Sequence, residues 1–136
     1  MRKKIFYSFT LAALITICIS STVRANEEQT PLIFICHKGK IYSRDEVKFA
    51  FLGWNDESRA VNNRPLFPRL LEYIKYTENQ YSRSWNKTFF RMGRFKPKML
   101  LNDDEVIKYV SASYAGVGYV TVAPKDNPNV EVCGNF

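Results

Sequence analysis

The side chains most often used in catalysis are sparse in this chain of 136 residues. It contains one histidine, His37, and three cysteines. Nucleophilic catalysis needs a nucleophile, a base and a group that orients the base, and the sequence around His37 forms no such motif. One histidine and isolated cysteines also do not make a set of metal ligands. The sequence therefore predicts a protein that is not an enzyme, with no catalytic residues, no metal site and no cofactor.

The first 25 residues have the features of a secretory signal peptide. Three basic residues follow Met1, residues 6–20 are mostly apolar, and residues 23–25 read Val-Arg-Ala, which is a small-x-small cleavage site. We expect a periplasmic protein whose mature part, residues 26–136, is one domain without a membrane span. The formal charge of the whole chain is +7, and four of its cations lie in this signal.

Two cysteines remain in the mature chain, Cys36 and Cys133. Each lies in a short apolar run, at residues 32–36 and 130–133, and export would place both in an oxidising compartment. If the two runs are neighbouring strands, a disulfide ties the two ends of the domain together. Two buried free thiols are the alternative that the sequence leaves open.

Two helices are indicated by residues that cap their first turns. Ser43 and Glu46 form a capping box ahead of a helix over residues 43–52. Asn102 is followed three residues later by Glu105, and the acidic first turn between them suits the positive end of a helix dipole. We therefore assign the acidic residues after Asn102 to helix stabilisation.

Two further helices and three strands are also expected from the residues themselves. The helices are expected from Pro65 to about Tyr76 and from Gln80 to Met92, with a break at residues 77–79. The strands are expected at residues 32–36, 117–122 and 130–133. Strands that alternate with helices predict an α/β fold.

An ordered set of anchors and turns runs through the second half of the chain. It comprises an aromatic anchor, a glycine break, a proline turn, an acidic-capped helix and a glycine-rich strand, at Trp85, Gly93, Pro97, residues 102–106 and residues 115–120. This order resembles one lobe of the periplasmic phosphate-binding proteins of ABC transporters. The resemblance implies a single lobe of a type II periplasmic binding protein, with a small mixed sheet flanked by about four helices. It also implies non-enzymatic binding of phosphate or another oxyanion.

The resemblance also implies a short strand at residues 59–63, and it places the ligand at the junction between that strand and the next helix. In the phosphate-binding family this junction carries a Ser-Gly-Thr signature, which this chain lacks. The polar side chains that remain there are Asn62, Asn63, Arg64 and Arg69. The resemblance therefore implies that a bound oxyanion contacts these four residues.

A basic stretch supports a different function. Between Asn79 and Asn102 the chain has six lysines or arginines and no acidic residue. The predicted interaction face consists of Arg83, Lys87, Arg91, Arg94 and Lys96. The alternative function is a protein-interaction module that contacts an envelope protein through this face and has no small-molecule ligand.

Aromatic residues interleave with these cations, a mixture that can also hold nucleic acid or anionic lipid headgroups. A periplasmic location makes nucleic acid an unexpected partner. The regular spacing of Tyr81, Trp85 and Phe89 favours another interpretation, in which the aromatic side chains face the core and the cations only face water.

Overall fold

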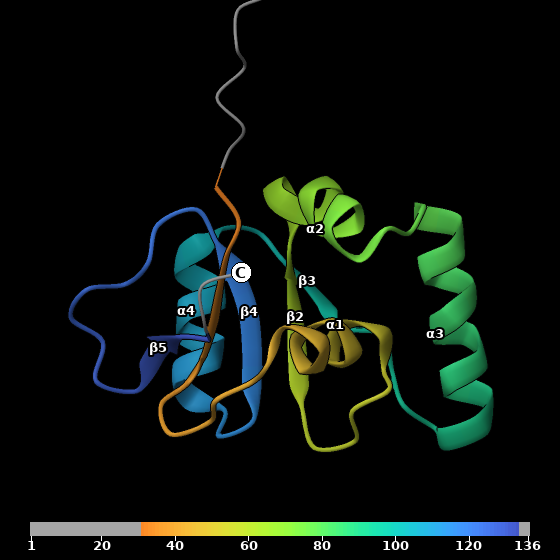
Figure 1. Ribbon diagram of the computed structural model, residues 1–136, viewed down its shortest axis with the longest axis horizontal. Helices are drawn as coiled ribbons and strands as arrows, with labels where there is room; N and C mark the ends of the chain where they lie inside the picture. Colours follow the sequence, from red (N-terminus) through yellow and green to blue (C-terminus); the bar gives the residue numbers. More distant parts are fainter. Residues whose placement is uncertain (1–30, 134–136) are drawn as a thin grey trace, which may run out of the picture.

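The computed structural model describes residues 31–133. The predicted signal peptide, residues 1–25, lies outside the described residues. Within them the chain forms one mixed sheet with helices on both of its faces (Figure 1). The predicted α/β fold is therefore confirmed, including its small mixed sheet and its four α-helices.

The sheet has five strands in the order β3-β2-β4-β1-β5. The strands are β1 (Ile33–His37), β2 (Arg59–Asn63), β3 (Lys98–Leu100), β4 (Gly116–Val120) and β5 (Val130–Val132). β2 is parallel to β3 and β4, whereas β1 is antiparallel to β4 and β5. The short edge strand β3 has no counterpart among the predicted strands.

The helices form the outer layers of the domain. They are α1 (Arg44–Leu52), α2 (Phe67–Ile74), α3 (Glu78–Met92) and α4 (Asp103–Ala112), and a 3₁₀ turn (Arg64–Leu66) precedes α2. In Figure 1, α3 stands at the side of the molecule, beyond α1. It reaches the rest of the domain by packing on the end of α1, where the Trp85 Nε1–H donates to the Phe51 carbonyl oxygen at 2.9 Å.

Alternation along β1 divides the core into two parts. Phe34 and Cys36 join the core beneath α1, α2 and α3, whereas Ile35 joins the core beneath α4 with Val106 and Val110. This is the period of two expected when both faces of a strand are covered. The arrangement leaves α4 as the main cover of one face of the sheet.

Local caps start the helices as the sequence predicts at two places. The Ser43 hydroxyl accepts from the Glu46 amide, and the Glu46 carboxylate accepts from the Ser43 amide. The Asn102 side chain accepts from the Glu105 amide at 3.0 Å. Both predicted caps are confirmed.

The predicted break between two helices is present, but it lies at residues 75–77 and not at residues 77–79. Thr77 is the N-cap of α3, and its hydroxyl accepts from the Gln80 amide while the Gln80 side chain accepts from the Thr77 amide. The helix therefore begins at Glu78. Thr-x-x-Gln is itself a capping-box pattern, so the sequence contained the signal that was missed.

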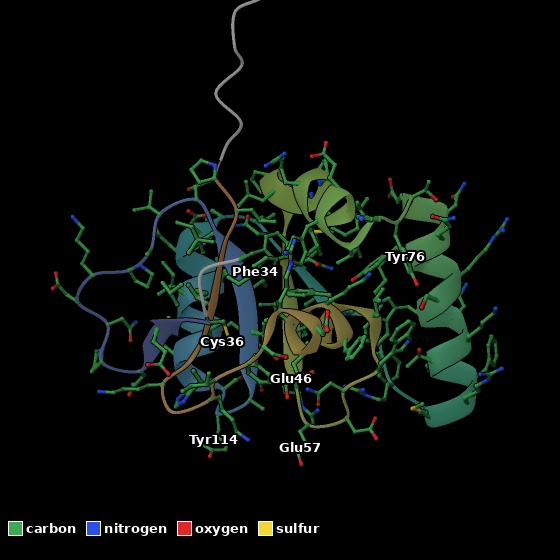
Figure 2. The ribbon with its side chains drawn as sticks, viewed as in Figure 1. Phe34, Cys36, Glu46, Glu57, Tyr76 and Tyr114 are labelled. Carbon is green, nitrogen blue, oxygen red and sulfur yellow. A yellow bond between two sulfur atoms is a disulfide. The ribbon has the colours of Figure 1, made fainter. Side chains whose placement is uncertain are left out.

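The disulfide between Cys36 and Cys133 is present, with the two Cα atoms 5.4 Å apart. Cys36 lies on β1 within the sheet (Figure 2), and β1 is the neighbour of β5. The amide of Cys133 also donates to the Phe34 carbonyl oxygen at 2.9 Å. The two apolar runs are thus neighbouring strands, and the disulfide expected in that case is confirmed.

Candidate functional site

Asn62, a predicted ligand-binding residue, is fully buried. Its Nδ2 donates to the Tyr81 hydroxyl at 3.0 Å, and the Tyr119 hydroxyl donates to its Oδ1 at 3.0 Å. Burial raises the pKa of Tyr81 to about 12 and raises that of Tyr119 as well, so both phenols stay neutral at ordinary pH. The Asn62 amide thus serves as a bridge between two core tyrosines.

Asn63 is also fully buried, and it connects three elements. Its Nδ2 donates to Asp103 Oδ1 at 2.7 Å and to the Tyr119 carbonyl oxygen at 3.0 Å. The other oxygen of Asp103 accepts from the Thr121 amide and hydroxyl. Burial acts to raise the pKa of Asp103, but these hydrogen bonds outweigh it and hold the pKa below its ordinary value.

The remaining two predicted ligand residues lie nearer the surface. Arg64 is exposed in the 3₁₀ turn, and the Arg69 Nη1 is 2.7 Å from the Glu72 carboxylate. The structure thus places two of the four residues inside the domain, where protein groups occupy most of their donors. Binding of an oxyanion by this set stays a prediction.

The predicted interaction face is divided between two hollows. Arg83, Lys87 and Arg91 follow one another at intervals of four residues along α3 and line a groove of about 480 Å³. Trp54 and Tyr76 contribute aromatic surface to the same groove. None of the ion pairs found within residues 31–133 involves these three cations.

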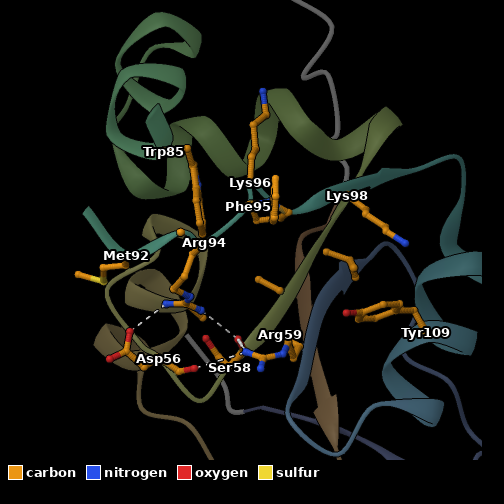
Figure 3. Close-up of a pocket in the computed structure, with 15 residues that line it drawn as sticks. Asp56, Ser58, Arg59, Trp85, Met92, Arg94, Phe95, Lys96, Lys98 and Tyr109 are labelled. Atoms are coloured by element: carbon orange, nitrogen blue, oxygen red, sulfur yellow. Dashed lines mark hydrogen bonds and ion pairs between the residues drawn. The ribbon is translucent and has the colours of Figure 1, made fainter. Parts of the chain in front are cut away.

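Arg94 has a structural role instead. Its Nη1 donates to the Gly53 carbonyl oxygen at 3.1 Å. The same Nη1 donates to Asp56 Oδ1 at 3.3 Å, and the Nη2 donates to the Ser58 carbonyl oxygen at 3.3 Å (Figure 3). The guanidinium therefore holds the loop between α1 and β2 against the loop that follows α3. Sequence spacing grouped Arg94 with the other cations because its partners lie about 40 residues away.

The second hollow is a pocket of about 610 Å³ beside Arg94 (Figure 3). Its basic lining residues are Arg59, Arg94, Lys96 and Lys98, and Asp56 is the acidic residue among its described lining. The size lies within the range of about 300–1,000 Å³ that is usual for small-molecule sites.

The sheet places two of these cations on one side of the pocket. Val61 pairs with Lys98 across β2 and β3, and Arg59 precedes Val61 by two residues. Because side chains alternate along a strand and paired residues share a face, Arg59 and Lys98 project to the face covered by α4. Tyr109 of α4 also lines the pocket, and in Figure 3 its hydroxyl points towards the side where Arg59 lies.

The donors of Arg59 are partly used. Its Nη1 donates to the Asp56 and Ser58 carbonyl oxygens at 3.4 and 3.3 Å. No hydrogen bond of its Nη2 is found within the described part of the chain. The Lys96 ammonium lies 5.7 Å from the centre of the Tyr81 ring, which directs it to a different part of the pocket wall. Arg59 and Lys98 are thus the cations best placed to meet a ligand together.

The described residues contain neither a cluster of metal ligands nor a membrane-spanning helix. No group of three or more histidine, cysteine, aspartate or glutamate side chains within residues 31–133 is arranged to hold a metal ion. No helix there has the length and apolar character needed to cross a bilayer. His37 ends β1, where its ring lies 5.7 Å from that of Tyr114.

Comparison with known proteins adds no constraint. No protein-family model, no curated protein and no solved structure matches this chain. The resemblance to phosphate-binding proteins therefore stays a prediction.

Proposed function

We propose that this chain is an exported, non-enzymatic binding domain that holds a small oxyanion between Arg59 and Lys98. The observation that carries the proposal is the excess of positive charge around the pocket of Figure 3, whose lining includes four basic residues and one acidic residue. An arginine offers paired N–H donors and a lysine offers a point charge, and both are usual ligands of phosphate and carboxylate. The Tyr109 hydroxyl supplies a neutral donor beside them.

Calorimetric titration of the mature chain with phosphate and with sulfate tests the proposal. Heat of binding is expected at millimolar ligand, because the cations are partly exposed and screened by water. The double variant Arg59→Gln/Lys98→Gln removes both proposed contacts and should abolish that heat. Absence of heat for the unaltered chain would refute oxyanion binding altogether.

A matched variant separates the pocket from the site that the resemblance implies. Arg64→Gln/Arg69→Gln removes the same number of positive charges at the start of α2. It should leave the affinity for phosphate within a factor of about two of that of the unaltered chain. Loss of binding in this variant alone would return the ligand to the predicted junction.

The groove on α3 supports a second candidate, the protein-interaction module. Arg83, Lys87 and Arg91 are spaced about 6 Å apart along the helix axis, at about 1.5 Å per residue. Alternate residues of an extended chain lie about 6.6 Å apart, so carboxylates on such a segment match this spacing. We propose that an acidic segment of an envelope protein is the partner of this groove.

Fluorescence anisotropy of a labelled peptide with glutamate at alternate positions tests the second candidate. The triple variant Arg83→Gln/Lys87→Gln/Arg91→Gln should weaken binding about tenfold or more. Lys38→Gln/Lys108→Gln/Lys125→Gln loses the same charge at exposed positions elsewhere and serves as the control. Equal weakening by both variants would show that only overall charge matters, and would remove the groove as a site.

A further inference from the structure

An exposed aromatic cluster lies at the end of α3 and in the loop that follows. The side chains of Phe89, Phe90 and Phe95 are 42%, 84% and 80% exposed. Their rings contact one another, with centroid distances of 5.6 Å between Phe89 and Phe90 and 5.2 Å between Phe89 and Phe95. Contiguous apolar surface of this kind is a usual mark of an interaction site.

The expectation that the aromatic side chains of this stretch face the core is wrong for three of them. Trp85 and Thr88 are buried because they lie over Gly53 at the end of α1. α3 continues for another turn beyond Thr88, and residues 89–92 of that turn are all exposed in the part of the chain that the structure describes. A Cβ added at Gly93 would meet nothing within 4 Å, which shows how open this end of the helix is.

The charged residues of the segment that contains the cluster are all basic. Residues 79–102 contain six cations and no acidic residue. A second copy of the chain, docked through the same surface about a twofold axis, would place these cations against their own copies. Like charges brought together in this way disfavour such a dimer. An anionic partner is favoured instead.

The shape of the cluster indicates which anionic partner fits. Phe90 and Phe95 are more than three-quarters exposed, so they project from the surface. A projecting ring requires a matching cavity in a folded partner, whereas the interface of a lipid bilayer accepts it without one. Aromatic rings in the interface of the bilayer, with cations beside the lipid headgroups, are the usual features of a peripheral membrane contact.

We propose that the Phe89–Phe90–Phe95 cluster docks this domain on an anionic phospholipid surface, with Arg91 and Lys96 next to the headgroups. The contact adjoins both hollows, because Phe95 and Lys96 also line the oxyanion pocket and Arg91 also lines the groove on α3. Phe89 and Phe90 line neither hollow.

Vesicle sedimentation tests the proposal with the chain from Asn26 onward, which contains all the described elements. Vesicles of phosphatidylglycerol mixed with phosphatidylcholine should bind it at least about tenfold more tightly than vesicles of phosphatidylcholine alone, and added salt should weaken the binding. Phe89→Ser/Phe90→Ser/Phe95→Ser should reduce the partition coefficient about tenfold or more. Ile41→Ser/Tyr114→Ser/Val122→Ser removes three other exposed apolar side chains and should leave binding nearly unchanged.

Several results would overturn the proposal. Equal binding of the phenylalanine variant and its control, with both folded by circular dichroism, would show that the cluster does not contact lipid. Equal affinity for the two kinds of vesicle would show that the headgroup charge has no role. A dimer in analytical ultracentrifugation that the phenylalanine variant dissociates, without vesicle binding, would assign the cluster to a second copy of the chain.

Discussion

Asn62 illustrates how far the role of one residue depends on distant parts of the chain. Its amide both donates and accepts, and therefore matches one tyrosine hydroxyl on each side. The resemblance to phosphate-binding proteins implied a ligand contact for this residue, at the end of a strand. Its partners, Tyr81 and Tyr119, lie 19 and 57 residues away, so the bridge could not be predicted from local pattern. Arg94 was grouped with a binding face for the same reason.

Replacement of Asn62 should cost more stability than its size implies. Asn62→Ala leaves two buried hydroxyls without their amide partner, which should lower the free energy of unfolding by about 2–4 kcal/mol. Urea unfolding measures this. Asn86→Ala, at an exposed position on α3, should change the free energy of unfolding by less than about 0.5 kcal/mol. Similar effects of the two substitutions would contradict the bridging role.

At the scale of elements, patterns among residues close together in the sequence were predictive. Strand pairing and the cover that one helix gives another could not be predicted from such patterns. The caps at Ser43 and Asn102 involve residues three positions apart, so the sequence displays them directly. β3 has three residues and is held by its pairing with β2, which no local pattern reveals. The helix period correctly placed Trp85 inside, but it could not show that the cover provided by α1 ends before Phe89.

The Asp103 carboxylate, in the first turn of α4, contributes to the stability of the domain in a way that depends on pH. The folded state holds the pKa of Asp103 below its ordinary value of 3.8, so it favours the carboxylate, which accepts from Asn63 and Thr121. This contribution is present above pH 3.8 and is lost as the pH falls through the folded pKa. Asp103→Asn should lower the free energy of unfolding at neutral pH by about 1–2 kcal/mol.

Urea unfolding of the Asp103→Asn variant and the unaltered chain between pH 7 and pH 3 checks this prediction. The difference between them should shrink as the pH falls below 3.8. Asp104→Asn changes the same charge at an exposed neighbour and supplies the baseline. A difference for Asp103→Asn that stays constant over this range would contradict the role of its carboxylate.

At the scale of the whole molecule, the disulfide links segments near the two ends of the described chain. Cys36 and Cys133 are 97 residues apart and join β1 to the residue that follows β5. Such a loop restricts the unfolded chain, and Cys36→Ser/Cys133→Ser should lower the free energy of unfolding by about 3–5 kcal/mol. A reductant should produce a similar loss in the unaltered chain and none in the variant. No effect of the reductant on either protein would contradict a stabilising disulfide.

The central claim for the whole molecule is that it binds an oxyanion in the pocket between β2, β3 and α4. The most direct measurement follows backbone amide signals by nuclear magnetic resonance while phosphate is added. The account predicts that saturable shift changes cluster at Arg59, Lys98 and Tyr109. Changes confined to Arg64 and Arg69, or no saturable changes at all, would contradict it.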